Sequence, residues 1–416
     1  MRVLITFFPI DDMGGIINHH EQLCAGLKDL GHEVTTKLLV WRDAPPRSVA
    51  GGRGSRQHSG LEFDQRRGFS WGASDIIAYK GSANLARWKE YAEQFDLIIW
   101  QVAVPTKRKE NRGNLDWLHL YRLELPKQVA VVHDGNFLAS YPWMYAVADQ
   151  LDGLACVHNC AFNSAQHISV PSFLIPNPFE IQYPDISEEA YADRRGALSV
   201  QTWKAWKRVP ELLRAMLYVR HTELKLAGKG IDYYYLTSKD KCKYPGVWDA
   251  VVGHGVEYLD VITNEQRDKL LGEVVCSVDA SWSKKYAAIG AHFNRVQVEA
   301  IMRGAVPVVR DIAVAYSIFK HDVNCLTIPW DATPQEFAEL LDEYCTMPYD
   351  RYRHIMENAV ALLPNFERTK VAQDYLDLAH PSQRSGGDDI LVQMGTTSDQ
   401  VKADGADALV NFFKGY

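Results

Sequence analysis

The residues whose types and spacing best suit chemistry lie where a predicted helix over Arg295–Arg303 precedes a predicted buried strand over Val306–Val309. Backbone N–H groups are unpaired at a helix start, so the stretch Asn294–Val296 favours an anion such as a diphosphate. Glu299 follows about one helical turn later and could accept hydrogen bonds from a ribose diol. A single helical glutamate more commonly faces only solvent, so the pattern alone leaves both roles open.

Two lysines form a second candidate site after the predicted strand Ala197–Val200. Lys204 and Lys207 lie close together among tryptophans, and both could contact one phosphate. Solvated lysines beside packed tryptophans would give the same pattern. The lysines therefore identify a phosphate site only together with further matches.

The N-terminal half places small and titratable residues at predicted strand ends. Gly14 and Gly15 follow the first strand, where a loop that closely approaches a ligand needs glycine. His133 and Asp134 come at the end of a predicted strand over Gln128–His133, and open α/β sheets bind ligands at such ends. A histidine that only packs at the strand end is the alternative for His133. No complete G-x-G-x-x-G is present, which argues against a nicotinamide cofactor.

Four further polar residues lie near the first predicted loop, namely Asp11, Asp12, His19 and His20. They could contact an acceptor molecule. The two histidines could equally form only the polar start of the helix predicted over Ile16–Leu30. Both explanations stay open at the level of the sequence.

Apolar strand-like runs alternate with amphipathic helix-length segments through most of the chain, as in parallel sheets with crossover helices. The first series of predicted strands covers Arg2–Phe8, His32–Val40, Asp96–Val102, Gln128–His133 and Leu154–Val157. The second series covers Ala197–Val200, Leu224–Ala227, Val256–Leu259, Val274–Val278 and Val306–Val309. Predicted helices between the later strands include Val209–Arg220, Asn264–Leu271 and Arg295–Arg303.

The chain is too long, at 416 residues, for one ordinary core, and two domains are expected. The restart of the pattern places an N-terminal domain at 1–180 and a C-terminal domain at 181–380, with the proline-rich stretch Pro171–Pro184 as their linker. A loop insertion over 41–76, rich in Gly, Arg and Ser, interrupts the first domain. Residues 381–416 are predicted to be a polar appended tail.

Composition excludes several classes of protein. Hydrophobic residues at 47% and charged residues at 23% are typical of a soluble globular chain. No apolar run is long enough for a transmembrane segment and the N-terminus has no signal-peptide pattern, so a cytoplasmic location is expected. The seven cysteines have neither metal-site nor disulfide-framework spacing, which indicates reduced thiols and no metal site. A net charge of −7 argues against a globally basic nucleic-acid binder.

The segment Ala291–Val309 resembles the donor motif of the retaining family-four glycosyltransferases. In that family two glutamates eight positions apart flank a Gly-Phe-Gly-Leu loop and precede a Gly-x-Pro-Val-Val strand. Glu299-Ala300 and Gly304–Val309 match the second half of the motif, and Phe293 matches the loop aromatic residue. Ala291 stands in place of the first glutamate, and the loop also differs at His292, Asn294 and Arg295.

Further matches occur in the family's order over most of residues 1–380. They are Ile175–Glu180, Trp203–Arg208, Val256–Asp260 with Asn264–Gln266, Asn324–Pro329, and Phe366–Leu376. By this resemblance Lys204 and Lys207 occupy the place of the family's diphosphate-binding pair. His133 matches the histidine that approaches the donor sugar. Each match is weak alone, and the shared order is the specific part.

The resemblance implies an α/β GT-B fold, in which two Rossmann-like domains face each other across a cleft. It implies a hexosyl- or pentosyltransferase that moves a sugar from a nucleotide-diphosphate-sugar to an acceptor hydroxyl with retention. The departing diphosphate would be stabilised electrostatically, and no metal or other cofactor would be required. The donor-binding residues that it implies are Gly14, Gly15, Lys204, Lys207, His292, Phe293, Asn294, Arg295, Val296 and Glu299. The catalytic residues that it implies are His133, Asp134, Lys207 and Glu299.

In this family the N-terminal domain binds the acceptor, and here its loops are basic. Residues 42–127 hold 15 lysines and arginines against 10 acidic residues. Arginines interleaved with aromatic residues suit a polyanion with bases to stack, which suggests a flipped-out hydroxymethylpyrimidine of DNA, as in the DNA-modifying sugar transferases of bacteriophages. Solubilising loop charges with a lipid-linked or small glycan acceptor are the alternative. The acceptor-binding residues on the DNA hypothesis are Arg53, Arg56, Arg66, Arg67, Lys107, Arg108 and Lys109.

Other classes of protein fit the same pattern. A sugar-phosphate epimerase or a phosphorylase can share a two-domain fold of this kind, because a fold does not fix the reaction. The alanine at position 291 also suits a non-catalytic protein that binds a nucleotide-sugar or nucleic acid. The sequence carries no signal for the identity of the nucleotide, the sugar or the oligomeric state.

Overall fold

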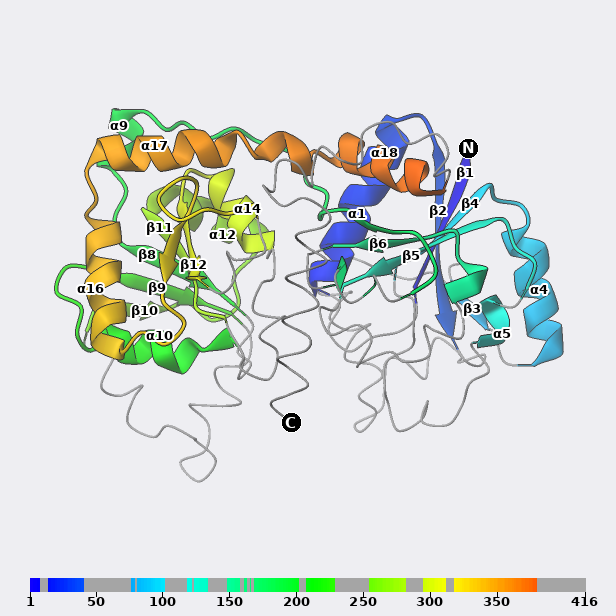
Figure 1. Ribbon diagram of the computed structural model, residues 1–416, viewed down its shortest axis with the longest axis horizontal. Helices are drawn as coiled ribbons and strands as arrows, with labels where there is room; N and C mark the ends of the chain where they lie inside the picture. Colours follow the sequence, from blue (N-terminus) through cyan, green and yellow to red (C-terminus); the bar gives the residue numbers. More distant parts are fainter. Residues whose placement is uncertain are drawn as a thin grey trace, which may run out of the picture. The chain divides into compact units, whose positions relative to one another are not determined.

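The computed structural model divides the chain into two compact units (Figure 1). Unit 1 comprises Met1–Glu180 and the chain from Asn365 onward, and unit 2 comprises Ile181–Pro364. The residues that the structure describes are 1–7, 14–40, 76–78, 81–101, 118–121, 123–133, 148–157, 161–162, 165, 168–201, 207–228, 254–281, 295–311 and 318–379. The predicted insertion 41–76 lies outside them except for its last residue, and the predicted tail 381–416 lies outside them entirely.

In unit 1 the described strands form one parallel sheet in the order β3-β2-β1-β4-β5-β6-β7. These strands are β1 (Arg2–Phe7), β2 (Glu33–Val40), β3 (Ile76–Ala78), β4 (Leu97–Trp100), β5 (Lys127–Val132), β6 (Gly153–Cys156) and β7 (Ser172–Leu174). The helices are α1 (Gly14–Asp29), α4 (Ser82–Ala92), α5 (Leu118–Tyr121) and α18 (Arg368–Ala379), with a 3-10 turn at Ala148–Gln150. The strand order reverses between β1 and β4, as in a Rossmann-like sheet.

Strand β1 shows why the first strand of the sequence is mostly apolar. Val3, Ile5 and Phe7 pack on one face of the sheet in a core that includes residues of α1 and α18. Leu4 packs on the other face with Trp88 of α4. Successive side chains of a strand point to opposite faces, so a strand covered by helices on both sides is apolar at most positions, with Thr6 as a buried polar residue in β1.

The C-terminal helix α18 belongs to unit 1, although the sequence predicted it at the end of a domain over 181–380. It contacts α1, β5 and β6, and Figure 1 shows it beside α1. A Cβ on Gly26 would lie 2.2 Å from the carbonyl oxygen of Arg368, and one on Gly153 would lie 2.4 Å from Cδ1 of Leu378. Two positions without side chains therefore let α18 approach α1 and the sheet closely.

The stretch Pro171–Pro184 was predicted to be a linker, but its first part is a strand. Residues Ser172–Leu174 form β7, which pairs with β6 at the edge of the unit 1 sheet. An edge strand tolerates a neighbouring proline because its outer N–H groups have no ladder partner. Strands β3, β7 and, in the other unit, β13 (Leu326–Ile328) were not predicted.

Unit 2 repeats the Rossmann-like order, with its described strands arranged β10-β9-β8-β11-β12-β13, all parallel. These strands are β8 (Ala197–Val200), β9 (Leu224–Ala227), β10 (Val256–Tyr258), β11 (Cys276–Asp279), β12 (Val306–Arg310) and β13 (Leu326–Ile328). The helices are α9 (Glu188–Ala192), α10 (Val209–Met216), α12 (Asn264–Glu273), α14 (Arg295–Ile301), α16 (Pro334–Cys345) and α17 (Tyr349–Val360), followed by a 3-10 turn at Leu363–Phe366.

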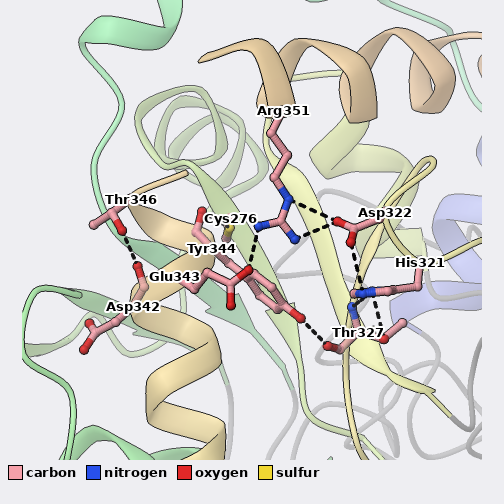
Figure 2. Close-up of polar contacts among 9 residues, drawn as sticks. All are labelled: Cys276, His321, Asp322, Thr327, Asp342, Glu343, Tyr344, Thr346 and Arg351. Carbon is pink, nitrogen blue, oxygen red and sulfur yellow. Dashed lines mark hydrogen bonds and ion pairs between the residues drawn. The ribbon is translucent and has the colours of Figure 1, made fainter. Parts of the chain in front are cut away.

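A polar network ties α16 and α17 to the β13 edge of unit 2 (Figure 2). Arg351 of α17 lies 2.7 Å from Oδ1 of Asp322 and 2.6 Å from Oε1 of Glu343 on α16. The hydroxyl of Tyr344 donates to the carbonyl oxygen of Thr327 on β13 at 2.7 Å. Because the ion pairs are partly exposed, each contributes at most about 1 kcal/mol, so the network orients these helices more than it stabilises them.

The close contact at Gly26 predicts a difference between two helical glycines. Gly26→Ala should lower the free energy of unfolding by about 1–3 kcal/mol, because the new methyl group would meet backbone atoms of Arg368. Gly272→Ala on α12 meets nothing within 4 Å and should raise it by up to about 1 kcal/mol through helix propensity. Urea unfolding followed by circular dichroism compares the two variants. An unchanged stability in Gly26→Ala would contradict the close packing of α18 on α1.

Candidate functional site

Polar residues gather in unit 2 at the carboxyl ends of β8 and β11, where the strand order reverses. Gln201 directly follows β8, and Asp279 is the last residue of β11. Lys207 lies between β8 and α10. Open parallel sheets bind ligands at such a switch point, because the connections leave the two central strands on opposite sides of the sheet.

Asp279 is the centre of this group, with only 7% of its surface exposed. Its Oδ1 accepts hydrogen bonds from the backbone N–H of Ser281, at 2.9 Å, and from the Ser281 hydroxyl. Its Oδ2 accepts one from Nε2 of Gln297 at 3.2 Å and lies 4.0 Å from Nζ of Lys207. Burial alone would raise the pKa of the Asp279 carboxyl, but Lys207 and these hydrogen bonds outweigh it and lower the pKa. The carboxylate is therefore ionised at neutral pH.

Glu299, on α14, is buried between two arginines and does not face solvent. Its Oε1 lies 3.1 Å from Nη1 of Arg267 on α12 and 3.7 Å from Nε of Arg295. Arg267 is held in turn by Asp268, whose Oδ1 lies 2.7 Å from its Nη2. Sequence reasoning missed Arg267, because one arginine in a polar helix carries no motif. Its only signal was its place just after Asn264–Gln266, a segment matched to the family.

Helix α14 is shorter than the sequence predicted. It runs over Arg295–Ile301, whereas a helix over Arg295–Arg303 was expected. A helix of two turns has a small macrodipole, so we assign the positive charge at this site to side chains rather than to the helix start. Arg295 and Val296 form its first turn, and both are partly buried.

A buried arginine holds the far ends of α12 and α14. Nη1 of Arg194 donates to the carbonyl oxygens of Leu271 at 3.2 Å and Val274 at 3.0 Å. Its Nη2 donates to the carbonyl oxygen of Arg303 at 2.7 Å. Carbonyl groups at helix ends need such partners, and one guanidinium here serves two helices. Arg194 thus fixes the two elements that carry Arg267 and Glu299.

In unit 1, His133 lies at the carboxyl ends of two neighbouring strands. It follows β5, and its Nε2 lies 3.0 Å from Nε2 of Gln101, which follows β4. The ring of His19 on α1 meets the His133 ring edge to face, with centroids 4.9 Å apart. The structure therefore brings together His133 and His19, and adds Gln101, which sequence reasoning missed.

His19 is buried and held from both sides. Its Nδ1 lies 2.9 Å from Oδ1 of Asn177, and its Nε2 lies 3.1 Å from the hydroxyl of Tyr375 on α18. An amide oxygen only accepts, so Nδ1 donates to Asn177. The interpretation of His19 and its neighbour His20 as a polar helix start is wrong, since both are buried.

The remaining predicted site residues lie either in the first turn of α1 or outside the described part of the chain. Gly14 and Gly15 form the first turn of α1 rather than a loop before it. Several predicted residues lie outside the described part of the chain, namely Asp134, Lys204, His292, Phe293, Asn294, Arg53, Arg56, Arg66, Arg67, Lys107, Arg108 and Lys109. Asp11 and Asp12 lie outside it too.

Within the described residues, no three His, Cys, Asp or Glu side chains are grouped so that they could hold a metal ion. None of the described helices has the length and apolar character that crossing a membrane requires.

Solved structures of known proteins have a similar fold. No protein-family model and no curated protein matches the sequence. HepE of Anabaena, solved in complex with UDP, has a TM-score of 0.64 at 14% identity, over 92% of this chain and 100% of that chain. An α-glucosyltransferase solved with UDP and a 13-mer DNA has a TM-score of 0.60 at 11% identity, over 91% and 99%. Sucrose-phosphate synthase of Thermosynechococcus elongatus has 0.60 at 13% identity, over 92% and 99%.

The chain has the GT-B fold. The fold class predicted from the sequence is thereby confirmed. At these identities the similarity shows the fold alone, because one fold supports many reactions.

Buried His20 predicts a loss of stability in acid. Burial, with a smaller contribution from Lys28, lowers the pKa of His20 from 6.5 to about 3. Below pH 6.5 the unfolded chain binds a proton that the folded chain does not, so the free energy of unfolding falls as the pH decreases toward 3. Lowering the pH from 7 to 5 should therefore reduce the free energy of unfolding by about 2 kcal/mol through His20 alone.

Urea unfolding at pH 7 and pH 5 tests this for wild type, His20→Gln and the control His354→Gln, an exposed histidine on α17. The pH-dependent loss should shrink by about 2 kcal/mol in His20→Gln and persist in His354→Gln. The same loss in all three proteins would show that His20 is not its source.

Proposed function

We propose that the protein is a glycosyltransferase that moves a sugar from a nucleoside-diphosphate donor to an acceptor hydroxyl. The observation that carries the proposal is the ion pair of Lys207 with buried Asp279 at the switch point of unit 2. A fixed cation at the carboxyl ends of parallel strands suits a diphosphate. The proposal is supported by the fold, which is shared with proteins solved in complex with UDP.

In the proposed reaction the bond between the anomeric carbon and the β-phosphate oxygen breaks, and a bond forms from that carbon to the acceptor oxygen. The nucleoside diphosphate leaves with the bonding electron pair, and its growing charge is stabilised by Lys207 and Arg295. The proton of the acceptor hydroxyl passes to the departing phosphate. This sequence of steps retains the anomeric configuration and requires no metal ion.

The other site residues take roles around the donor. Glu299 accepts hydrogen bonds from the ribose diol, oriented by the two arginines that contact its Oε1. By the family resemblance, His133, positioned by Gln101 and His19, takes the role of the histidine that approaches the donor sugar. Asp134, Lys204 and the segment His292–Asn294 keep the donor-site roles that the family resemblance assigns to them.

Lys207 should contribute to donor binding through its charge. Lys207→Ala should weaken binding of UDP at least tenfold, since a charge-assisted hydrogen bond contributes about 1.5–3 kcal/mol. Isothermal titration calorimetry measures the dissociation constant directly.

The matched control is Lys225→Ala, which removes another partly buried lysine of unit 2, one that pairs with Glu273 at 3.0 Å. It should leave UDP affinity unchanged. Equal affinities in all three proteins would remove Lys207 from the donor site.

Release of UDP from a UDP-sugar that depends on an added acceptor would distinguish a transferase from an epimerase, a phosphorylase or a binding protein.

We further propose that the acceptor hydroxyl lies on a modified base of DNA. The excess of basic residues over 42–127 supports this, as does the DNA in one structure of similar fold. Charged loops that bind a polyanion release counterions, which makes the affinity depend steeply on salt. A lipid-linked or small glycan acceptor is the competing assignment, and such an acceptor would not share this salt dependence.

Binding to a hydroxymethylated duplex should weaken about a hundredfold or more between 50 and 200 mM salt. Replacing Arg53, Arg56, Arg66 and Arg67 by alanine should reduce the slope of log affinity against log salt by about 3 to 4. The control replaces Lys269 and Arg353, two exposed cations of unit 2, by alanine. It should leave the slope of log affinity against log salt unchanged. No DNA binding at low salt, or transfer only to glycans, would contradict the DNA acceptor.

A further inference from the structure

The partners of Asp279 come from separate elements of unit 2. Lys207 precedes α10, Gln297 lies in the first turn of α14, and Ser281 follows β11. Within the described part of the chain, the Oδ2 of Asp279 faces both the Lys207 ammonium and the Gln297 amide. Through this one oxygen, the side chain of Lys207 and the start of α14 are fixed relative to each other.

Gln297 depends strongly on this contact. It is 2% exposed, and among the described residues its Oε1 has no hydrogen-bond partner. The bond from Nε2 to Asp279 is therefore the one that its amide makes within the described part of the chain. A buried amide that keeps one polar atom unsatisfied costs free energy, so the remaining bond is needed to hold the side chain in place.

A second, partly buried carboxylate of unit 2 is used differently. Asp342 accepts hydrogen bonds from the backbone N–H groups of Arg220, His221 and Thr222, at 2.6, 3.0 and 2.9 Å. Those partners are backbone groups, which a carboxylate holds in order to shape a loop. The Oδ2 of Asp279 instead faces two side chains, those of Lys207, which belongs to the proposed donor site, and of Gln297, which lies beside Arg295 in the first turn of α14.

We propose that Asp279 is a positioning residue of the donor site, which fixes the Lys207 ammonium and the first turn of α14 for the donor diphosphate. This inference rests on the proposed function. Lysine has a long stem with many rotamers, so losing the contact with Asp279 would widen the range of positions that the Lys207 ammonium takes. The first turn of α14 carries Arg295, so its displacement would move a second cation of the proposed donor site.

The negative charge of Asp279 allows a positioning role to be distinguished from a purely electrostatic one. A carboxylate near a diphosphate repels it, so if Asp279 only neutralised Lys207, its removal would strengthen binding of the donor. If Asp279 positions Lys207, its removal weakens binding. The two roles therefore predict changes of opposite sign in the same measurement.

The test compares UDP with uridine, which has no phosphate, by calorimetry on wild type and Asp279→Asn. The substitution keeps the volume of the side chain and removes its charge. UDP binding should weaken about tenfold, while uridine binding should change less than twofold, since the Lys207 contact is made only to phosphate. The control Asp342→Asn should lower the melting temperature and leave both affinities unchanged.

A double-mutant cycle then asks whether Asp279 acts through Lys207. In a Lys207→Met background, Asp279→Asn should weaken UDP binding less than threefold. Should Asp279→Asn fail to fold, Gln297→Met keeps the charge of Asp279 and removes the α14 contact, and it should weaken UDP binding about threefold with uridine unaffected.

The possible failures are distinguishable. Wild type that binds no nucleoside diphosphate would overturn the proposed function together with this inference. Wild type that binds UDP, with Asp279→Asn binding it equally or more tightly, would overturn only the positioning role. Equal losses for UDP and uridine, or equal losses in both backgrounds of the cycle, would do the same.

Discussion

Burying a carboxylate costs free energy unless cations and hydrogen-bond donors surround it, and at Asp279 this requirement shapes unit 2. The charge lies at the end of a central strand, so its partners must come from the connections that leave the sheet there. Lys207 comes from one connection and Gln297 from another. A constraint of stability thus assembles cationic and amide groups at the place where a parallel sheet binds ligands.

The charged side chains around Glu299 are paired in the same way. Glu299 is neutralised by Arg267 and Arg295, and Arg267 is held by Asp268. Asp268 also pairs with Arg303, 2.6 Å from its Oδ2. Alternating charges of this kind hold long side chains in defined rotamers, because moving one of them leaves its neighbour unpaired. The site is therefore rigid through electrostatics as well as through packing.

The sequence predicted the strands of both sheets well where they are buried on two faces. Ala197–Val200 and Leu224–Ala227 form strands with the predicted bounds, because their apolar runs are short and flanked by turns. Three residues are too few to show a strand period by themselves, and β3, β7 and β13 escaped prediction. The equally short β10 was predicted within the longer run Val256–Leu259. Helix α18 was predicted as a helix, but its assignment to the second domain was wrong. Amphipathic periodicity indicates that a face is buried, and not which core buries it.

The candidate site was predictable only in part. Lys207, Glu299 and His133 stood out because residue type, strand ends and family order coincided. Asp279, Gln101 and Arg267 did not, because their importance comes from contacts with residues far away in the chain, such as that of Asp279 with Gln297. A polar residue at the end of an apolar run looks like an ordinary strand terminus. Its role appears only once the register of neighbouring strands is known.

Unit 1 completes its core with the last helix of the described chain. Val371 and Tyr375 pack in the same cluster as Val3 and Ile5, while the residues of unit 2 lie between them in the sequence. During synthesis on the ribosome the N-terminal strands emerge first, and they must wait for this missing helix with an apolar face uncovered. Unit 2 is continuous in sequence and needs no later segment for its own sheet. The domain that is translated second is therefore the first that can finish folding.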